Sequence, residues 1–119
     1  MRVLGFTERW PKLEKWEFTT FRFPRQDKDW YEGEIVQVVY RPRGKNRKAL
    51  GVARIVSVHR RLMWRITRGE AIQDGFSCQA EMRRWLEVAS KDRPHGETMS
   101  KLTLQWVGVA MDKLEKEAQ

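Results

Sequence analysis

The chain of 119 residues lacks several features that would point directly to a function. Its single cysteine, Cys78, excludes an internal disulfide and a zinc site built from cysteines. The two histidines, His59 and His95, are far apart in the sequence, and no carboxylate cluster has metal-ligand spacing. A glycine-rich phosphate loop and a serine nucleophile elbow are also missing. We therefore expect neither a metal nor a cofactor.

Long hydrophobic runs are missing as well. No segment approaches the roughly 20 apolar residues of a membrane span, and the N-terminus lacks the apolar core of a signal peptide. Hydrophobic residues make up 40% of the chain and charged residues 34%, as in an ordinary folded domain. These observations predict a cytoplasmic protein with no membrane partner.

Positive charge is what the chain has in excess. Lysine and arginine total 24 against 16 acidic residues, which gives a net charge of +8. A field of this sign attracts polyanions such as RNA or nucleotides, although it can also simply keep a small protein soluble. RNA or a nucleotide is the partner we expect, and an acidic protein is the alternative. The oligomeric state stays open.

Hydrophobic patterning predicts strands over residues 18–23, 34–40, 50–59 and 102–107, after an extended start and a short helix ending near Trp16. A capping box at Thr67 and Glu70 opens a helix that ends near Gly75, and Ser77 caps a second helix. The apolar stripe of that second helix consists of Cys78, Met82, Trp85, Leu86 and Ala89. The result is an α+β fold, a small curved mixed β-barrel or sheet with flanking helices. It spans residues 1–108, followed by a charged helix or tail over 109–119.

A pair of polar residues on the first predicted strand is the main candidate for ligand binding. Thr20 and Arg22 share one side of the strand, opposite Phe21 and Phe23. Arg22 could present its planar fork to a phosphate or a base edge. The alternative is a surface ion pair of Arg22 with Glu17 or Glu34, which contributes little to stability.

Further basic residues are candidates for contacts with a phosphate backbone. They are Arg25, Arg41, Arg43, Lys45, Arg47, Lys48, Arg60 and Arg61. Five of them fall in the turn over residues 41–48, and such turns are more often merely solvated.

Six tryptophans are many for this length. Trp85 and Trp106 lie on apolar stripes and are expected in the core, as is Cys78. Trp64 could serve in the core or at a surface. Trp30, beside Tyr31 in a polar loop, is the candidate for stacking on a base.

Several segments in order resemble the ASCH domain, a β-barrel relative of the PUA RNA-binding fold. They are Gly33-Glu34-x-Val36-x-Val38, Gly51-x-Ala53-x-Ile55-x-x-Val58, Glu70-Ala71-Ile72-Gln73-Asp74-Gly75-Phe76-Ser77 and Leu102-Thr103-Leu104-x-Trp106. The resemblance covers residues 4–107. It implies that RNA or a modified nucleoside binds in a cleft between the barrel and the helices.

Some bacterial ASCH proteins are small amidohydrolases that remove an acyl group from N4-acetylcytidine, and they carry the motif Gly-x-Lys-x-x-Thr-x-Arg. In this chain the threonine and the arginine fall on Thr20 and Arg22, but the glycine falls on Lys15 and the lysine on Glu17. The family's catalytic carboxylate falls on or beside Asp74, whose alternative role is to cap the helix before Gly75. Thr20, Asp74 and Glu17 are thus the candidate catalytic residues.

Glu17 departs from the family motif, which has a lysine at this position. The departure matters for catalysis, because a carboxylate cannot replace the chemistry of a lysine that activates a nucleophile. The sequence therefore favours a module that binds nucleic acid, RNA or a modified nucleotide. The second alternative is an amidohydrolase acting on N4-acylated cytidine, or a ribonuclease. The third is a protein-interaction module that uses the basic surface.

Overall fold

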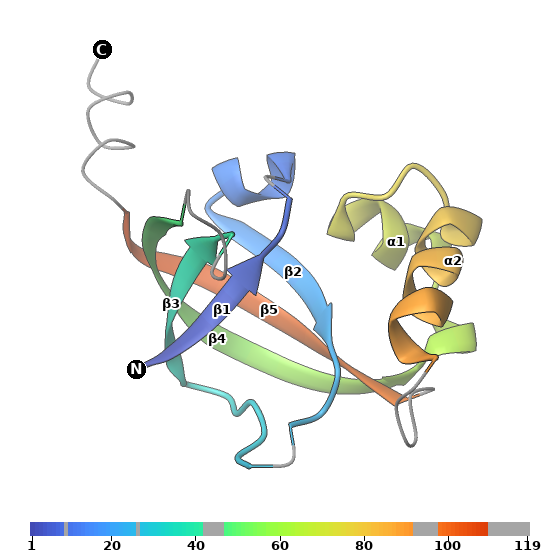
Figure 1. The fold of residues 1–119 in the computed structure, drawn as a ribbon, viewed down its shortest axis with the longest axis horizontal. Helices are drawn as coiled ribbons and strands as arrows, with labels where there is room; N and C mark the ends of the chain where they lie inside the picture. Colours follow the sequence, from blue (N-terminus) through green and yellow to red (C-terminus); the bar gives the residue numbers. More distant parts are fainter. Residues whose placement is uncertain (9, 26, 42–46, 92–97, 110–119) are drawn as a thin grey trace.

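The structure is a computed structural model that describes residues 1–8, 10–25, 27–41, 47–91 and 98–109. Two helices, α1 (Arg68–Asp74) and α2 (Gln79–Ser90), stand beside one curved sheet (Figure 1). The strands are β1 (Arg2–Phe6), β2 (Glu17–Arg22), β3 (Ile35–Tyr40), β4 (Lys48–Leu62) and β5 (Thr98–Val109). Two short 3-10 turns, η1 (Pro11–Glu14) and η2 (Met63–Arg65), complete the fold.

The sheet has the strand order β1-β3-β4-β5-β2. Strand β1 runs parallel to β3, and the other neighbours are antiparallel, so the sheet is mixed. Bulges interrupt the pairing of the long strands β4 and β5, and bulges of this kind bend a strand and increase its twist. The expected α+β fold with a small curved mixed sheet and flanking helices is therefore confirmed.

Two hydrophobic clusters form the core. One is enclosed by the sheet and includes Leu4, Phe6, Val36, Ile55 and Leu104. The other lies under the helices and is built from Phe21, Ile66, Ala71, Phe76, Met82, Leu86 and Met99. Strand β2 contributes to both clusters, since Phe18 belongs to the first cluster and Phe21 to the second. The boundary between the clusters is where the polar residues of β2 lie.

Helix α1 follows the sequence prediction closely. The Thr67 hydroxyl accepts a hydrogen bond from the Glu70 amide at 3.1 Å, and the Glu70 carboxylate accepts one from the Thr67 amide at 3.2 Å. Gly75 ends the helix with a left-handed backbone, φ 115°. The capping box and the glycine stop are both confirmed.

Other predicted boundaries were wrong. The extended start is strand β1, and the short helix is only the 3-10 turn η1, because Lys15 already has an extended backbone that leads into β2. Strand β4 continues to Leu62, beyond the predicted end at residue 59, because its pairing with β5 extends to Thr98. Strand β5 reaches Val109, and the predicted tail beyond it lies outside the described residues.

The start of α2 also differs from the prediction. Cys78, not Ser77, occupies the cap position, while the Ser77 hydroxyl contacts the Glu81 carboxylate. Cys78 is exposed, because a cap residue precedes the first turn that packs on the sheet, so its predicted burial was wrong. No helix in the described part of the chain has the length and hydropathy of a membrane span.

Candidate functional site

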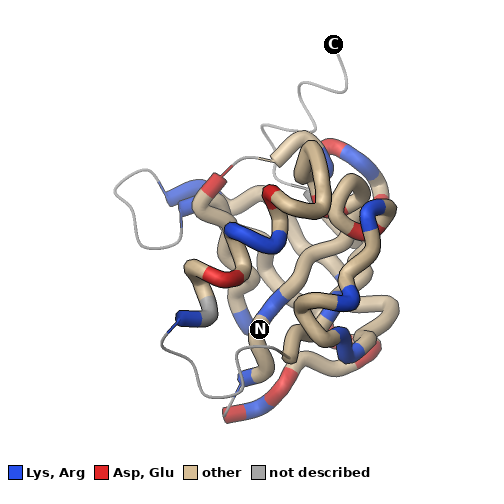
Figure 2. Tube along the Cα trace, turned by 90° about the vertical axis from the view of Figure 1, so that its right-hand side faces the viewer, with Lys and Arg blue, Asp and Glu red and all other residues tan. Residues whose placement is uncertain are grey.

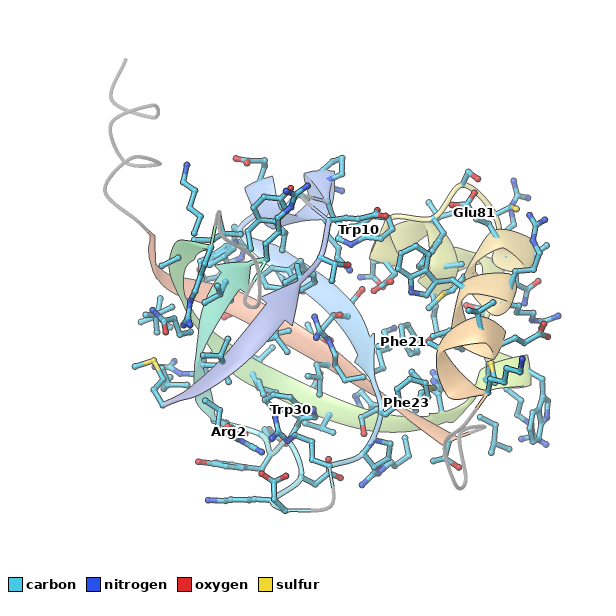
Figure 3. The ribbon with its side chains drawn as sticks, in the orientation of Figure 1. Arg2, Trp10, Phe21, Phe23, Trp30 and Glu81 are labelled. Atoms are coloured by element: carbon cyan, nitrogen blue, oxygen red, sulfur yellow. The ribbon has the colours of Figure 1, made fainter. Side chains whose placement is uncertain are left out.

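An open cleft of about 1240 Å³ separates the ends of β1 and β2 from the helices. Phe6 and Arg22 line it from the strands, Asp74 from α1, and Trp85 and Leu86 from α2. Figure 3 shows Phe21 and Phe23 between β2 and α2, with Trp10 at the η1 side. The cleft exceeds the roughly 300–1,000 Å³ of typical small-molecule pockets. Its size suits a segment of a polymer better than an enclosed small ligand.

A buried ion pair adjoins this cleft through Asp74, which lines it. Lys12 Nζ of η1 is 3.0 Å from Asp74 Oδ1 at the end of α1, and both side chains are buried. The Lys12 ammonium also stands over the rings of Phe6 and Trp10, 5.5 Å from each centroid. The surroundings of Lys12 are therefore aromatic on two sides and anionic on a third.

Burial moves the two pKa values of this pair toward each other. It lowers the pKa of Lys12, although the negative charge of Asp74 opposes the shift. It also raises the pKa of Asp74, against the attraction of Lys12 and Arg22. Both shifts have the same cause, which is the removal of the two charged groups from water.

Arg22 lies next to this pair on strand β2. Its Nε donates a hydrogen bond to Thr20 Oγ1 at 3.2 Å, and its guanidinium stands 4.6 Å from the centroid of the Phe6 ring. Burial lowers the pKa of Arg22 to about 10, so the group is still charged at neutral pH. Neither terminal nitrogen has a hydrogen-bond or ion-pair partner within the part of the chain that the structure describes. Arg22 thus presents free donors to the cleft.

The alternative considered for Arg22, an ion pair with Glu17 or Glu34, is not formed. Glu34 instead accepts from Arg2 Nε at 2.6 Å, and Glu17 accepts from Gln105 Nε2 at 2.8 Å. Glu17 is exposed and stands on the opposite side of β2 from Thr20 and Arg22, since successive side chains of a strand alternate.

Of the predicted catalytic residues, the structure therefore places Thr20 and Asp74 at the site and keeps Glu17 away from it. The residue that sequence reasoning missed is Lys12, which meets Asp74 across 62 positions of sequence. Its only sequence signal was a lysine between Pro11 and Leu13, one of two lysines between Trp10 and Trp16. Lys15, two residues from Glu17, is exposed.

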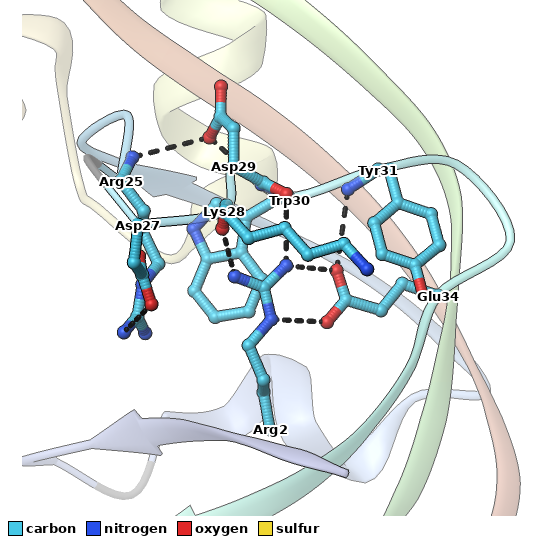
Figure 4. A network of polar contacts seen from close by, with 8 residues as sticks. All are labelled: Arg2, Arg25, Asp27, Lys28, Asp29, Trp30, Tyr31 and Glu34. Carbon is cyan, nitrogen blue, oxygen red and sulfur yellow. Dashed lines mark hydrogen bonds and ion pairs between the residues drawn. The ribbon is translucent and has the colours of Figure 1, made fainter.

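The position of Trp30 does not fit the expectation that this residue stacks on a base. It is only 7% exposed, and the guanidinium groups of Arg2 and Arg25 stand 4.5 and 5.4 Å from the centroids of its rings. Figure 4 shows the reason: Arg2 also hydrogen-bonds the backbone oxygens of Lys28 and Asp29, which holds the loop against β1. Trp30 is part of the packed wall of the cleft and has no free face for a base in this arrangement.

The other predicted basic contacts are scattered, and acidic residues neutralise several of them. Arg25 lines the cleft but pairs with Asp27 at 3.0 Å. Arg60 pairs with Asp29, and Arg61 lies 3.3 Å from Glu70. Figure 2 shows the blue and red segments scattered over a mostly tan trace, with no single blue face in this view.

The remaining basic residues belong to the turn that joins β3 and β4. Arg41 and Arg47 are exposed, Lys48 begins β4, and Arg43 and Lys45 lie outside the described residues. Arg41, Arg47 and Lys48, the described members of this group, do not line the cleft. A contact of this turn with phosphates stays a prediction.

No protein-family model matches the sequence, and no curated protein matches it. Solved structures do match in fold. The ASCH protein from Zymomonas mobilis is 12% identical with a TM-score of 0.55, and the match covers 96% of this chain and 76% of that one. This chain has the ASCH fold.

A DUF984 protein from Enterococcus faecalis V583 is also similar, with a TM-score of 0.61 and 10% identity. That match covers 84% of this chain and 69% of the other. The resemblance to ASCH domains that the sequence suggested is thereby confirmed at the level of the fold. At such identity the likeness concerns the fold alone, and function must be argued from the site.

Proposed function

We propose that this ASCH-fold protein binds single-stranded RNA and takes one nucleotide into the cleft. The observation that carries the proposal is the arrangement of Arg22. Its charged guanidinium is held by Thr20 and the Phe6 ring, and its terminal nitrogens are unpaired among the described residues. Such a fork matches the paired oxygens of a phosphate or the edge of a base.

The shape and charge of the molecule support the same conclusion. The cleft is open and larger than a typical small-molecule pocket. A net charge of +8 favours encounter with a polyanion. A base reaches such a cleft only from an unpaired strand, where it can be splayed away from its neighbours.

The test is fluorescence anisotropy of a short labelled single-stranded RNA with the wild type, Arg22→Gln and Arg54→Gln. Arg22→Gln should weaken binding roughly 10- to 150-fold, the value of a hydrogen bond to a charged group. Arg54 is exposed on β4 outside the cleft, so its replacement controls for the loss of one charge. Wild-type affinity in folded Arg22→Gln removes Arg22 from the site, and no binding by the wild type at low salt rejects the proposal.

A second candidate function rests on Lys12, Asp74 and Thr20. Arg22, which donates to the Thr20 hydroxyl, interacts electrostatically with the pair, and Lys12 supplies the amine that the sequence motif lacked at Glu17. In an amidohydrolase acting on N4-acetylcytidine, the Thr20 hydroxyl would attack the acetyl carbonyl while Lys12 in its neutral form accepts the hydroxyl proton. Lys12 would then return that proton to N4 as the amide C–N bond breaks and cytidine leaves. Water would hydrolyse the remaining threonine ester and release acetate.

Chromatography of N4-acetylcytidine incubated with the protein tests this activity. The wild type should release cytidine, and Lys12→Met and Thr20→Val should release none, while Arg54→Gln stays active. No product with ample wild-type protein rejects the amidohydrolase. Incubating the labelled RNA in parallel tests the ribonuclease alternative by the appearance of shorter fragments.

A further inference from the structure

Three aromatic rings from three separate segments form one wall of the cleft. Trp10 precedes η1, Phe76 follows α1 and Trp85 belongs to α2, and all three line the cleft. The ring centroids of Trp10 and Phe76 are 5.2 Å apart, and those of Trp85 lie 6.0 Å from Trp10 and 5.9 Å from Phe76. We name this group the aromatic wall.

Trp85 is the member of the aromatic wall that reaches the solvent of the cleft. Its side chain is 45% exposed, whereas Phe76 is buried and Trp10 is half-buried. The contacts of Trp85 with both neighbours are edge-to-face, at 69° and 66°, an arrangement that aromatic rings favour. Because these contacts already orient the indole, a ligand would meet a preset surface and lose little freedom in ordering it.

The rest of α2 leaves this surface accessible. Ala89, one turn beyond Trp85, also lines the cleft and can cover the ring only with a methyl group. The buried residues of the helix, Met82 and Leu86, anchor it on the second hydrophobic cluster. The exposed indole thus stands on a packed helix and not on a loop.

The chemistry around the aromatic wall indicates what the indole would meet. Arg22 lines the same cleft, and its terminal nitrogens have no partner among the described residues. An aromatic surface that shares a cleft with the Arg22 cation matches a ligand that carries a planar ring and an anionic or carbonyl group. Proteins that hold single-stranded nucleic acid combine these two features.

We propose that Trp85 is the base-stacking residue of the cleft, with Trp10 and Phe76 holding its ring in place. A nucleotide of single-stranded RNA would stack its base on Trp85 while its oxygens accept hydrogen bonds from Arg22. The inference rests on the proposed RNA binding. Trp16 and Trp64 are more exposed, at 65% and 55%, but neither lines the cleft.

The experiment measures the affinity of the same labelled RNA for the wild type, Trp85→Leu, Trp85→Phe and Trp64→Leu. Trp85→Leu should lose roughly 5- to 150-fold in affinity, the value of one stacked base. Trp85→Phe keeps a ring and should lose less, and Trp64→Leu should bind as the wild type does. Leucine retains apolar contact with Trp10 and Phe76, and circular dichroism checks that each variant is folded.

A second readout uses the fluorescence of the indole. Stacking on a base should quench Trp85, so the quenching caused by unlabelled RNA should shrink in Trp85→Phe at saturating RNA. This readout decides the question even if Trp85→Leu fails to fold.

The outcomes separate the two proposals. If the wild type binds RNA and folded Trp85→Leu binds equally well, or Trp64→Leu loses as much, stacking on Trp85 is overturned and RNA binding stands. Undiminished quenching in Trp85→Phe also overturns it. If the wild type does not bind RNA, the proposed function fails and this inference fails with it.

Discussion

Lys12 and Asp74 are both buried, and the free-energy cost of burying either charge is offset mainly by the other, with Arg22 also attracting Asp74. A buried ion pair often contributes little to stability compared with apolar residues of the same size, whereas breaking it by removing one partner is costly. Besides Asp74, the Lys12 ammonium faces two aromatic rings, which compensate its burial less than a carboxylate does. Such a pair is better explained by a role in the cleft than by its contribution to folding.

Urea denaturation of three variants tests this explanation. Lys12→Met and Asp74→Leu should each lower the free energy of unfolding by about 3–5 kcal/mol, because each leaves one buried charge alone. The double variant should be as stable as the wild type or up to about 4 kcal/mol more stable. A double variant as unstable as the single ones would show that the pair stabilises the fold.

At the scale of the element, the end of α1 positions one side of the site. Gly75 has a left-handed backbone, and a Cβ at this position would lie 2.8 Å from Cε3 of Trp10. Glycine is therefore required here for its backbone conformation and for the close approach of Trp10. The helix stop that places Asp74 also sets the position of the aromatic wall.

Gly75→Ala should lower the free energy of unfolding by about 1–2 kcal/mol for backbone strain and by about 1–3 kcal/mol more for the clash with Trp10. Gly33→Ala is the matched control, because its φ is 90° and nothing lies within 4 Å of the added Cβ. Thermal unfolding compares the two. Equal destabilisation would mean that Trp10 moves aside without cost.

The start of α1 should make stability depend on pH through Glu70. Burial acts to raise the pKa of Glu70, but the Thr67 amide, Lys101 at 3.0 Å and Arg61 together hold it below its ordinary value. A carboxylate with a lowered pKa stabilises the native state above its ordinary pKa, near 4.5, and this contribution is lost as the pH falls through the lowered value.

Glu70→Gln should therefore be less stable than the wild type at neutral pH, and the difference should shrink as the pH falls below about 4.5. Urea denaturation across the acid range measures this. Glu32→Gln, at an exposed position in the loop before β3, serves as the control. A difference that stays constant down to strong acid would contradict the assignment.

For the whole molecule, the count of 24 lysines and arginines overstates the number of cations available to RNA. Arg25, Arg60 and Arg61 are each paired with a carboxylate. The terminal nitrogens of Arg22, in contrast, have no partner among the residues that the structure describes, and Arg22 lines the cleft. We expect electrostatic contacts to concentrate there and not to spread over the surface.

The salt dependence of RNA binding checks this distribution. Each phosphate contact in a single strand changes the slope of log K against log salt by about 0.7. Arg22→Gln should make the slope shallower by about 0.7 if Arg22 contacts a phosphate, and Arg60→Gln should leave it nearly unchanged. The reverse result would place the phosphates over β4 and away from the cleft.

The sequence by itself determined the class of fold and most of its elements. Alternation marked β2, a segment apolar on both faces marked β3, and the residues from Thr67 to Gly75 marked both ends of α1. These signals are local, because a strand or a helix end depends on neighbours within a few positions. Thr20, Arg22 and Asp74 could be named for the same reason, since they lie on those elements and match a motif.

Only the tertiary structure decided which side chains meet. Lys12 reaches Asp74 across 62 positions, Arg2 folds the loop of Trp30 against β1, and Trp85 is left half-exposed on a helix whose pattern predicted burial. The polarity of a side chain does not settle its exposure, because exposure depends on which distant segments pack against it. The aromatic wall and the ion pair are products of that packing.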